Sequence, residues 1–547
     1  MQRAHKNQPL LRTMAGRALG FAIIAVAAAP AAAQSPVLPD KRIDISERTW
    51  GVSGAGHYLA ARKAEADYDY PNAAKFYEAA LGRDPNNLRL REKALFLLVA
   101  EGRVADAKQH ARAVLREKPT EYLPVLTTSI LDFAAGRYEQ AITQMAVLDN
   151  TGHVGFIRRV TQAWAAAGMG DLLAAKAALG LNSGPEVPNQ LLAIQGALIE
   201  DVAGGDPAKA YQDLDAKFGD TPGRIRDLIA NYQERAAGKD VPPSVASVGD
   251  GLAQIFASFA SGLTRGQNRD LGLTYTQLGR YLAPENEQLA LLLADLMYRQ
   301  ERHRDAARAY DLVSESSPLY YDAQVERSRS LARADDIETA LTVAQAVAGS
   351  QPNRAAAVTL MGDIYRGEAR FEEAAASYDK AFAQLGDAAT DNWRLHYRRG
   401  IVRERSGAWE KAEADLSRAL EIKKDQPLVL NYLGYSWIDR GENLEKAKGM
   451  VRRAAALRPE DGFIADSVGW AAYRTGDMEE AVAEMERAVA LEPLDPTINE
   501  HLGDVYWAAG RRLEANYQWE KAMALDPLPE RVAELEKRLR CGLDPCD

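Results

Sequence analysis

Residues 501–527 read HLGDVYWAAGRRLEANYQWEKAMALDP, and Gly503, Ala515 and Pro527 follow one another at intervals of twelve residues. The same three marks recur upstream with a period of 34 or 35 residues. They are Gly400, Gly434 and Gly469 for the first mark, Ala412, Ala447 and Ala481 for the second, and Pro459 and Pro493 for the third. A constant period of this length indicates an array of repeated structural units rather than one globular core.

The residues within one period predict two antiparallel helices joined by a short turn. Gly or Ala at the eighth and twentieth positions lets the two backbones approach closely, which a larger side chain would prevent. Large apolar residues such as Tyr506 and Trp519 fill the space beside that contact. Proline near the end of the period stops the second helix, because it cannot continue the backbone hydrogen bonds. One hairpin leaves an apolar face uncovered, so successive hairpins must stack.

This pattern resembles the tetratricopeptide repeat (TPR) family. LGYSWIDRG, VGWAAYRTG and LGDVYWAAG resemble the first-helix half of that repeat, and EKAKGMVRRAAALRP, EEAVAEMERAVALEP and LEANYQWEKAMALDP resemble the second-helix half. The resemblance implies an all-α fold, a right-handed superhelical α-solenoid of about twelve TPR-like helix hairpins with a C-terminal capping helix.

The period also organises the rest of the chain. Pro284, Pro318 and Pro352 are again 34 residues apart, whereas residues 252–284 keep a helical periodicity without the small-residue register. We therefore expect a degenerate unit at 252–284. The predicted organisation is a signal peptide at 1–33, a disordered tail at 34–53, an N-terminal TPR-like solenoid at 54–237, a linker or long loop at 238–251, a middle TPR segment at 252–384, a C-terminal TPR segment at 393–528, and a capping helix with a tail at 529–547.

The first residues carry the features of a bacterial secretory signal. Residues 1–17 are basic, residues 18–29 are an apolar run, and Ala31-Ala32-Ala33 matches an A-x-A-type cleavage site. The apolar run is too short to span a bilayer permanently. No cysteine follows it, so no lipid attachment is expected. We therefore expect a periplasmic protein that is not integral to the membrane after cleavage, and association with the outer membrane stays open.

Charge and motifs argue against several function classes. The net charge is −10, and residues 1–33 contribute +4 of it, so a processed chain would carry −14. This disfavours general affinity for nucleic acid or anionic lipid. None of the seven histidines is paired at i,i+4, and no G-x-x-x-x-G-K-[ST] phosphate loop occurs. The sequence therefore predicts no catalytic residues, no metal site and no cofactor.

The two cysteines, Cys541 and Cys546, lie in the last seven residues. An oxidising compartment would permit a disulfide between them, and two unbridged thiols remain the alternative. Two ligands without a nearby histidine are too few for a metal ion.

The family pattern places positions 2, 5, 9, 12 and 13 of each unit on the concave groove. Counted from residues 393, 427, 462 and 496, the predicted partner-binding residues are Arg394, Tyr397, Arg405, Asn431, Tyr435, Asp439, Asp466, Trp470, Tyr473, Arg474, Glu500, Asp504 and Trp507. Such a mixture of aromatic and charged side chains suits a peptide groove. Alternatively, the aromatic residues pack between repeats. We expect packing for Trp519, and both interpretations stay open for Trp470, Tyr473 and Trp507.

One binding mode of the family is not carried over. Chaperone-binding repeats hold a C-terminal carboxylate with a Lys and two Asn at fixed positions. The fifth position here carries Tyr397, Asn431, Asp466 and Glu500, so the set is missing, and the two acids would repel a carboxylate.

These features favour a non-enzymatic periplasmic adaptor or scaffold that binds a protein or peptide partner. The block from Asn431 to Pro527 also resembles envelope proteins of this family, including the lipoprotein adaptor that presents cell-wall hydrolases to a carboxyl-terminal processing protease. That resemblance implies an envelope protease or its substrates as partner, although the lipid-attachment cysteine is missing here. The alternatives are an assembly or secretion factor for outer-membrane protein, pilus or polysaccharide export and, less favoured, a hydrolase or transferase on a helical scaffold.

Overall fold

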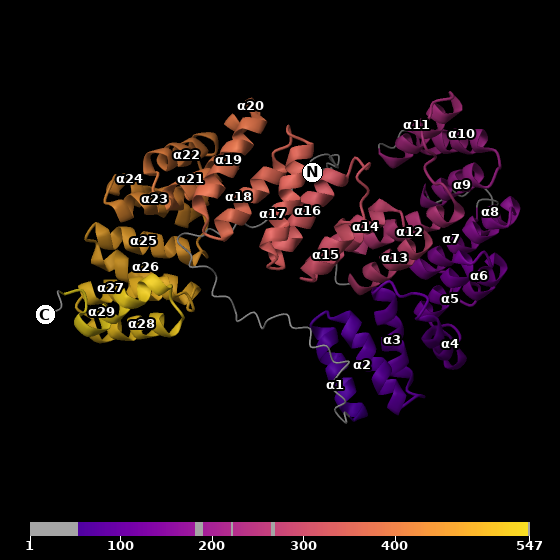
Figure 1. Ribbon diagram of the computed structural model, residues 1–547, viewed down its shortest axis with the longest axis horizontal. Coiled ribbons are helices and arrows are strands. Elements are labelled where there is room, and N and C mark those ends of the chain that lie inside the picture. Colours follow the sequence, from indigo (N-terminus) through magenta and orange to yellow (C-terminus); the bar gives the residue numbers. More distant parts are fainter. Residues whose placement is uncertain (1–52, 181–189, 220–222, 264–268, 545–547) are drawn as a thin grey trace, which may run out of the picture. The chain divides into compact units, whose positions relative to one another are not determined.

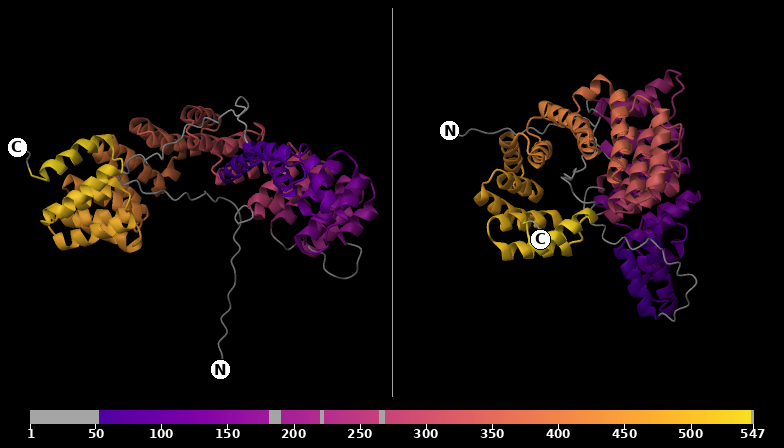
Figure 2. Two further views of the ribbon diagram at one scale, coloured as in Figure 1. Left: turned by 90° about the horizontal axis from the view of Figure 1, so that it is seen from below. Right: turned by 60° about the vertical axis from the view of Figure 1, so that its left-hand side comes forward.

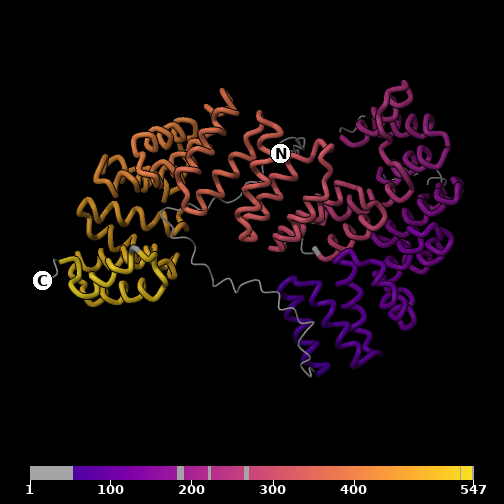
Figure 3. Tube along the Cα trace, in the orientation of Figure 1, coloured from indigo at the N-terminus to yellow at the C-terminus, as the bar shows by residue number. Residues whose placement is uncertain are grey.

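The computed structural model describes residues 53–180, 190–219, 223–263 and 269–544, and this part of the chain contains helices and no strand. Helix pairs follow one another along the chain (Figures 1 and 3). The predicted all-α array of stacked hairpins is therefore confirmed for the described residues. The signal peptide predicted at 1–33, most of the tail predicted at 34–53 and Cys546 lie outside them.

The helices form two compact units that divide between Pro352 and Asn353. The helices of the N-terminal unit are α1 (Gly54–Ala66), α2 (Tyr70–Arg83), α3 (Leu88–Ala100), α4 (Lys108–Glu117), α5 (Tyr122–Ala134), α6 (Tyr138–Met145), α7 (Gly152–Gly168), α8 (Leu172–Leu179), α9 (Gln190–Val202), α10 (Pro207–Phe218), α11 (Arg224–Ala236), α12 (Val248–Leu263), α13 (Arg269–Leu282), α14 (Glu287–Arg299), α15 (His303–Tyr310), α16 (Tyr320–Arg333) and α17 (Ile337–Ser350).

The C-terminal unit continues with more regular hairpins. Its helices are α18 (Ala356–Gly367), α19 (Phe371–Leu385), α20 (Asp387–Thr390), α21 (Trp393–Arg405), α22 (Trp409–Ile422), α23 (Pro427–Arg440), α24 (Leu444–Leu457), α25 (Gly462–Arg474), α26 (Met478–Leu491), α27 (Pro496–Ala508), α28 (Arg512–Ala524) and α29 (Pro529–Cys541). The last of these is the predicted capping helix, and it packs against α28.

The small residues of the repeat lie where the helices of a hairpin touch. A Cβ added at Gly469 of α25 would lie 2.8 Å from Cγ of Met485 in α26, and one at Gly503 would overlap the indole ring of Trp519. The alanines at the second mark are fully buried; they are Ala412, Ala447, Ala481 and Ala515. The predicted steric reason for the glycine and alanine marks is thus visible in the packing.

Local signals set the ends of the first helices. The carboxylate of Asp461 accepts a hydrogen bond from the backbone N–H of Ile464 at the start of α25 (3.2 Å), and Asp495 does the same for Ile498 in α27 (2.9 Å). Such N-caps satisfy backbone donors that have no partner within the helix. Gly476, in the left-handed conformation at φ 83°, turns the chain from α25 into α26.

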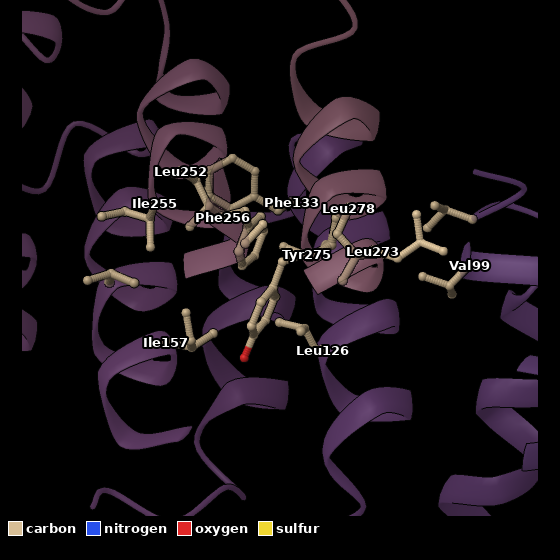
Figure 4. Packing of buried hydrophobic residues seen from close by; sticks show 14 of the residues in the cluster. Val99, Leu126, Phe133, Ile157, Leu252, Ile255, Phe256, Leu273, Tyr275 and Leu278 are labelled. Atoms are coloured by element: carbon tan, nitrogen blue, oxygen red, sulfur yellow. The ribbon is translucent and has the colours of Figure 1, made fainter. Parts of the chain in front are cut away.

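The hairpin α12–α13 packs differently from the other hairpins of the N-terminal unit. Helix α13 lies against α3 and α5, and α12 lies against α7 and α9, which are the first helices of four successive hairpins. Figure 4 shows Phe256 and Tyr275 among Leu126 and Ile157 in this core, and Figure 2 gives two further views of the unit. The hairpin therefore covers the face that these first helices share.

Buried polar contacts fix α13 in this position. The hydroxyl groups of Tyr122 and Tyr275 are 2.7 Å apart, and Nε2 of Gln277 donates to the carbonyl oxygen of Ala100 (2.9 Å). Tyr275 is fully buried. The hairpin lies over several first helices rather than within the regular stack, which explains why residues 252–284 lack the small-residue register.

Helix α12 begins at Val248, so the last four residues of the segment predicted as a linker, 238–251, are helical. The reason is tertiary. Gly251 lies against the fully buried ring of Trp164, and a Cβ at Gly251 would overlap that ring. Nε1 of Trp164 donates to Oε1 of Gln195 (2.9 Å), which holds the indole in place.

We expect Gly251→Ala to lower the free energy of unfolding of the N-terminal unit by about 1–3 kcal/mol, because overpacking forces the hairpin away from Trp164. The matched control is Gly262→Ala in the same helix, where no atom lies within 4 Å of the added Cβ. That change should be neutral or stabilising by up to about 1 kcal/mol. Urea unfolding followed by tryptophan fluorescence measures both, and equal effects would contradict the docking of α12.

Candidate functional site

The C-terminal groove, defined as the face formed by α21, α23, α25 and α27, contains a small pocket. In this unit α23 packs against α25, and α25 packs against α27. The pocket lies near the N-terminal turns of α25 and α27. The residues around it are Tyr435, Phe463, Asp466, Asp495, Thr497, Ile498 and His501. Two of them, Tyr435 and Asp466, are predicted groove residues.

A buried ion pair forms one wall of this pocket. Nδ1 of His501 lies 2.9 Å from Oδ1 of Asp466, and the imidazole stacks on Trp470 with ring centroids 4.3 Å apart. Burial lowers the pKa of His501, but the Asp466 carboxylate, together with the nearby Glu500 and Asp504, outweighs it and raises that pKa to about 8. At neutral pH the imidazole is therefore a cation held between a carboxylate and an indole face.

The capping helix α29 covers the acidic residues of the last repeat. Arg531 pairs with Glu500, and Nε of Arg538 donates to Oδ1 of Asp504 (2.8 Å). The same carboxylate oxygen accepts from Nε1 of Trp519 (2.9 Å). Helix α29 takes the place that a further first helix would occupy, so Glu500 and Asp504 are buried beneath it. Pairing with arginines offsets the cost of burying these two charges.

The structure divides the predicted groove residues into three groups. The exposed ones are Arg394, Arg405, Asp439 and Arg474. The partly buried ones are Tyr435, Trp470, Tyr473 and Trp507. The buried ones are Tyr397, Asn431, Asp466, Glu500 and Asp504. The buried group does not present the free surface expected from the register, because neighbouring first helices and α29 approach closely enough to cover it.

The aromatic residues have different roles. Trp519 is fully buried beside Gly503, so the packing interpretation is correct for it. Trp507 lies against Trp519 and against Gly542 beyond α29, which makes it part of the cap. Trp470 and Tyr473 remain partly exposed, with ring centroids 5.1 Å apart, and together they form an aromatic surface beside the pocket.

Five residues of the pocket were not predicted: Phe463, Asp495, Thr497, Ile498 and His501. Asp495 and His501 are the two of these whose side chains can carry charge. Burial raises the pKa of Asp495; the backbone N–H of Ile498 opposes this, and the Asp466 carboxylate adds to it. His501 and Asp466 are 35 residues apart, which is one repeat period. Residues separated by one period face each other in a stacked array, so this spacing was the signal that could have revealed the pair.

Some polar atoms near the groove have no hydrogen-bond partner in the described part of the chain. Oδ1 of Asn431 and the hydroxyl of Tyr397 are among them, and each side chain is 1% exposed. Nε1 of Trp470 is a third. Buried polar atoms are normally paired, so these three are notable.

Among the described residues, the other features do not form a second candidate site. A surface cavity of about 500 Å³ near α2 and α4 mixes both charge signs among Glu78, Arg103, Asp106, Lys108 and Arg112. Within the described ranges, no group of three or more His, Cys, Asp or Glu residues could hold a metal ion. No described helix combines the length and apolar character needed to cross a membrane. Cys541 is disulfide-bonded.

A tetratricopeptide repeat family model matches residues 291–355, 359–427 and 469–528. These three stretches are tetratricopeptide repeats. TPR proteins generally bind protein or peptide partners, and the TPR fold is typically a non-catalytic scaffold. A TPR repeat-containing protein of Pseudomonas aeruginosa is 27% identical over 183 residues, which cover 32% of this chain and 30% of that protein.

Several solved TPR structures are similar to parts of the chain. A tetratricopeptide repeat protein from Parabacteroides merdae is 14% identical, with a TM-score of 0.39, and covers 46% of this chain and 98% of its own. The Cut9–Hcn1 assembly of the APC/C is 13% identical, with a TM-score of 0.39, and the match covers 90% of this chain and 96% of that one. YrrB, described as a TPR protein with an unusual peptide-binding site, is 18% identical, with a TM-score of 0.28. The match covers 36% of this chain and 97% of YrrB. At TM-scores below 0.5, these superpositions support no inference about the C-terminal groove.

The raised pKa of His501 predicts that the stability of the C-terminal groove depends on pH. The folded-state pKa of His501 is about 8 and the unfolded value is 6.5. Protonated His501 therefore makes its full contribution to the free energy of unfolding below pH 6.5, and this contribution is lost as pH rises through 8. It amounts to about 2 kcal/mol at most. The carboxylates that act on His501 are those of Asp466, Glu500 and Asp504.

We therefore expect wild-type protein to lose stability in urea between pH 6.5 and pH 8 and beyond, and His501→Gln to show a flatter profile. The control is His303→Gln, because burial lowers the pKa of His303 and places its titration below this window. Six of the eight tryptophans lie in the C-terminal unit, so tryptophan fluorescence reports the unfolding of this unit. An identical pH profile for wild type and His501→Gln would contradict the ion pair with Asp466.

Proposed function

We propose that the protein is a non-enzymatic adaptor or scaffold that binds a segment of a protein partner in the C-terminal groove. The observation that carries this proposal is the contrast between the two units. In the N-terminal unit α12–α13 covers the first helices, with Phe256 and Tyr275 fully buried. In the C-terminal groove a pocket and the partly exposed rings of Trp470 and Tyr473 lie side by side.

The chemistry of the groove supports a peptide ligand. Trp470 and Tyr473 offer contact area at a small cost in side-chain entropy, and aromatic residues dominate the energetics of many interfaces. The partly buried carboxylate of Asp495 supplies a hydrogen-bond acceptor at the pocket. Together they suit an extended segment with alternating apolar and polar contacts.

The cellular setting of this function is also a proposal. The basic residues 1–17, the apolar run 18–29 and the alanines before Gln34 support export to the periplasm. In that compartment an envelope protease or its substrates would be the partner. An integral membrane protein as the partner would instead favour an assembly or secretion factor.

The direct test is cross-linking of the protein in envelope extract, followed by mass spectrometry. We expect Trp470→Ala combined with Tyr473→Ala to reduce partner capture at least about tenfold, because aromatic anchors carry much of the binding energy. The control is Tyr517→Ala on α28, whose ring is 61% exposed away from the groove. Circular dichroism should show unchanged helix content in all variants.

Equal capture by the double variant and the Tyr517→Ala control would overturn a groove-based function. Tyr473→Ala alone provides a milder variant if the double variant loses helix content. Cross-links that map outside α23, α25 and α27 would also count against the proposal.

A further inference from the structure

We infer that the partner segment bound in the C-terminal groove carries an acidic, a basic and a second acidic side chain at every third residue, and that these pair with Arg405, Asp439 and Arg474. We call these three residues the charged row. The inference rests on the proposed function, because it names the chemistry of the partner at the same groove. It is carried by the position of the three residues in the repeat, by their exposure and by the order of their charges.

The charged row occupies one position in three successive repeats. Arg405, Asp439 and Arg474 each follow the glycine mark of their repeat by five residues, in the last turns of α21, α23 and α25. These first helices follow one another in the C-terminal unit (Figure 1). The same position is uncharged in the repeats on either side, where it holds Gly367 and Ala508. Equivalent positions of stacked repeats line up across the array, so the row is a band of three charges with defined ends.

The side chains of the charged row are exposed, and within the described residues none of them forms an ion pair. Other arginines of α21 differ, because Arg399 and Arg403 both pair with Asp415 (2.7 and 2.8 Å). The remaining exposed arginine of α21 among the predicted groove residues, Arg394, stacks on Trp393 at the opposite end of the helix. Three neighbouring charges of alternating sign are thus left to face solvent together.

The protein positions both arginines of the row without using a carboxylate. The guanidinium of Arg405 lies over the ring of Phe371, 5.2 Å from its centroid. Nη1 of Arg474 donates to the backbone carbonyl oxygen of Asp439 (3.4 Å). These contacts orient the two guanidinium groups and leave most of their N–H donors unused. The remaining donors suit a bidentate pair with a carboxylate of the partner.

Asp439 has the opposite sign to the charge that its helix end favours. The carboxyl end of a helix carries a partial negative charge, so a cation there is stabilising and an acid is destabilising. Asp439 lies in the last turn of α23, and the arginine that follows it, Arg440, pairs instead with Glu442 (3.1 Å). A residue that opposes a local rule without internal compensation is typical of a binding site. The middle contact of the row is therefore assigned to a basic side chain of the partner.

The spacing of the row matches an extended chain. Helix α21 contacts α23 through the hydroxyl of Tyr432, which donates to Glu404 (2.8 Å), and α23 packs against α25. Packed helix axes lie about 8–10 Å apart. A polyproline-II segment has about three residues per turn and rises about 3.1 Å per residue, so every third side chain returns to the same face after about 9 Å. The three contacts therefore fall on every third residue of the partner.

The charged row ends beside the aromatic surface. Tyr473 precedes Arg474, and Trp470 lies one turn earlier on α25. The acid that pairs with Arg474 is therefore next to the side chain that contacts the two rings. A uniformly anionic ligand, such as nucleic acid or an anionic lipid surface, would place negative charge against Asp439. The alternation of charge thus favours a protein segment.

The test uses the full-length protein and three synthetic peptides that differ only at three positions, each separated from the next by two neutral residues. These positions carry Glu-Lys-Glu, Glu-Glu-Lys or Glu-Glu-Glu, and a Leu flanks both ends. The first two peptides have the same composition and net charge. We expect the Glu-Lys-Glu peptide to bind at least about fivefold more tightly than the Glu-Glu-Lys peptide, measured by fluorescence anisotropy. The second order places like charges together at two positions, whichever way the peptide runs.

Asp439→Lys should reverse this preference, weakening the Glu-Lys-Glu peptide at least about fivefold and making the Glu-Glu-Glu peptide the tightest of the three. A cation in the last turn favours the helix, so α23 should keep its fold. Asp439→Asn is a milder second variant, and it should remove most of the preference for Lys at the middle position. The control is Glu520→Lys, the same charge change at an exposed position of the second helix α28, which should leave the order of the peptides unchanged.

Three results would overturn the inference: equal binding of the Glu-Lys-Glu and Glu-Glu-Lys peptides, no binding of the Glu-Lys-Glu peptide, or an unchanged order of the peptides with Asp439→Lys. The cross-linking experiment separates this failure from failure of the proposed function. If the Trp470 and Tyr473 variant loses its partner while Asp439→Lys keeps it, the groove binds a segment without this charge pattern, and only the inference falls. If neither variant changes partner capture, both fall. Loss of the partner from both variants, with capture intact in Glu520→Lys, would support both.

Discussion

The structure depends on the close approach of two helix backbones in each hairpin. Gly469 and Gly503 leave no room for a Cβ between the helices, and the alanines at the second mark are fully buried on the opposing helix. This contact fixes how the two helices cross, and it therefore fixes which side chains of the first helix point away from the second. The groove and its pocket exist because the successive hairpins from α21 to α28 repeat this geometry.

The same stacking has different outcomes in the two units. In the N-terminal unit the face formed by α3, α5, α7 and α9 is apolar enough to bury a whole hairpin, α12–α13, with Tyr122 and Tyr275 joined through their hydroxyl groups. In the C-terminal groove the equivalent positions carry acidic, basic and aromatic side chains. Such a face cannot be covered by an apolar hairpin, because buried carboxylates need cations or hydrogen-bond donors.

Charge pairing explains how acidic residues persist inside the C-terminal array. Glu500 and Asp504 are buried because Arg531 and Arg538 of the capping helix neutralise them, and Asp466 is buried because His501 does so. The capping helix thus does more than shield the last hairpin from water. It also pairs the carboxylates of Glu500 and Asp504 with arginines, so these two acids are not free charges of the groove.

The sequence alone determined the hairpins, their period and their register. Gly434, Gly469 and Gly503 mark close contacts that any 34-residue helical repeat must make, so local sequence was sufficient to predict them. Tertiary structure decided what covers each face. The docking of α12–α13 and the burial of Glu500 under α29 depend on segments that meet only after the array has formed. The position of a residue in the repeat determines the direction in which its side chain points. Whether solvent reaches that side chain depends on neighbouring segments, and the repeat pattern does not determine where those segments pack.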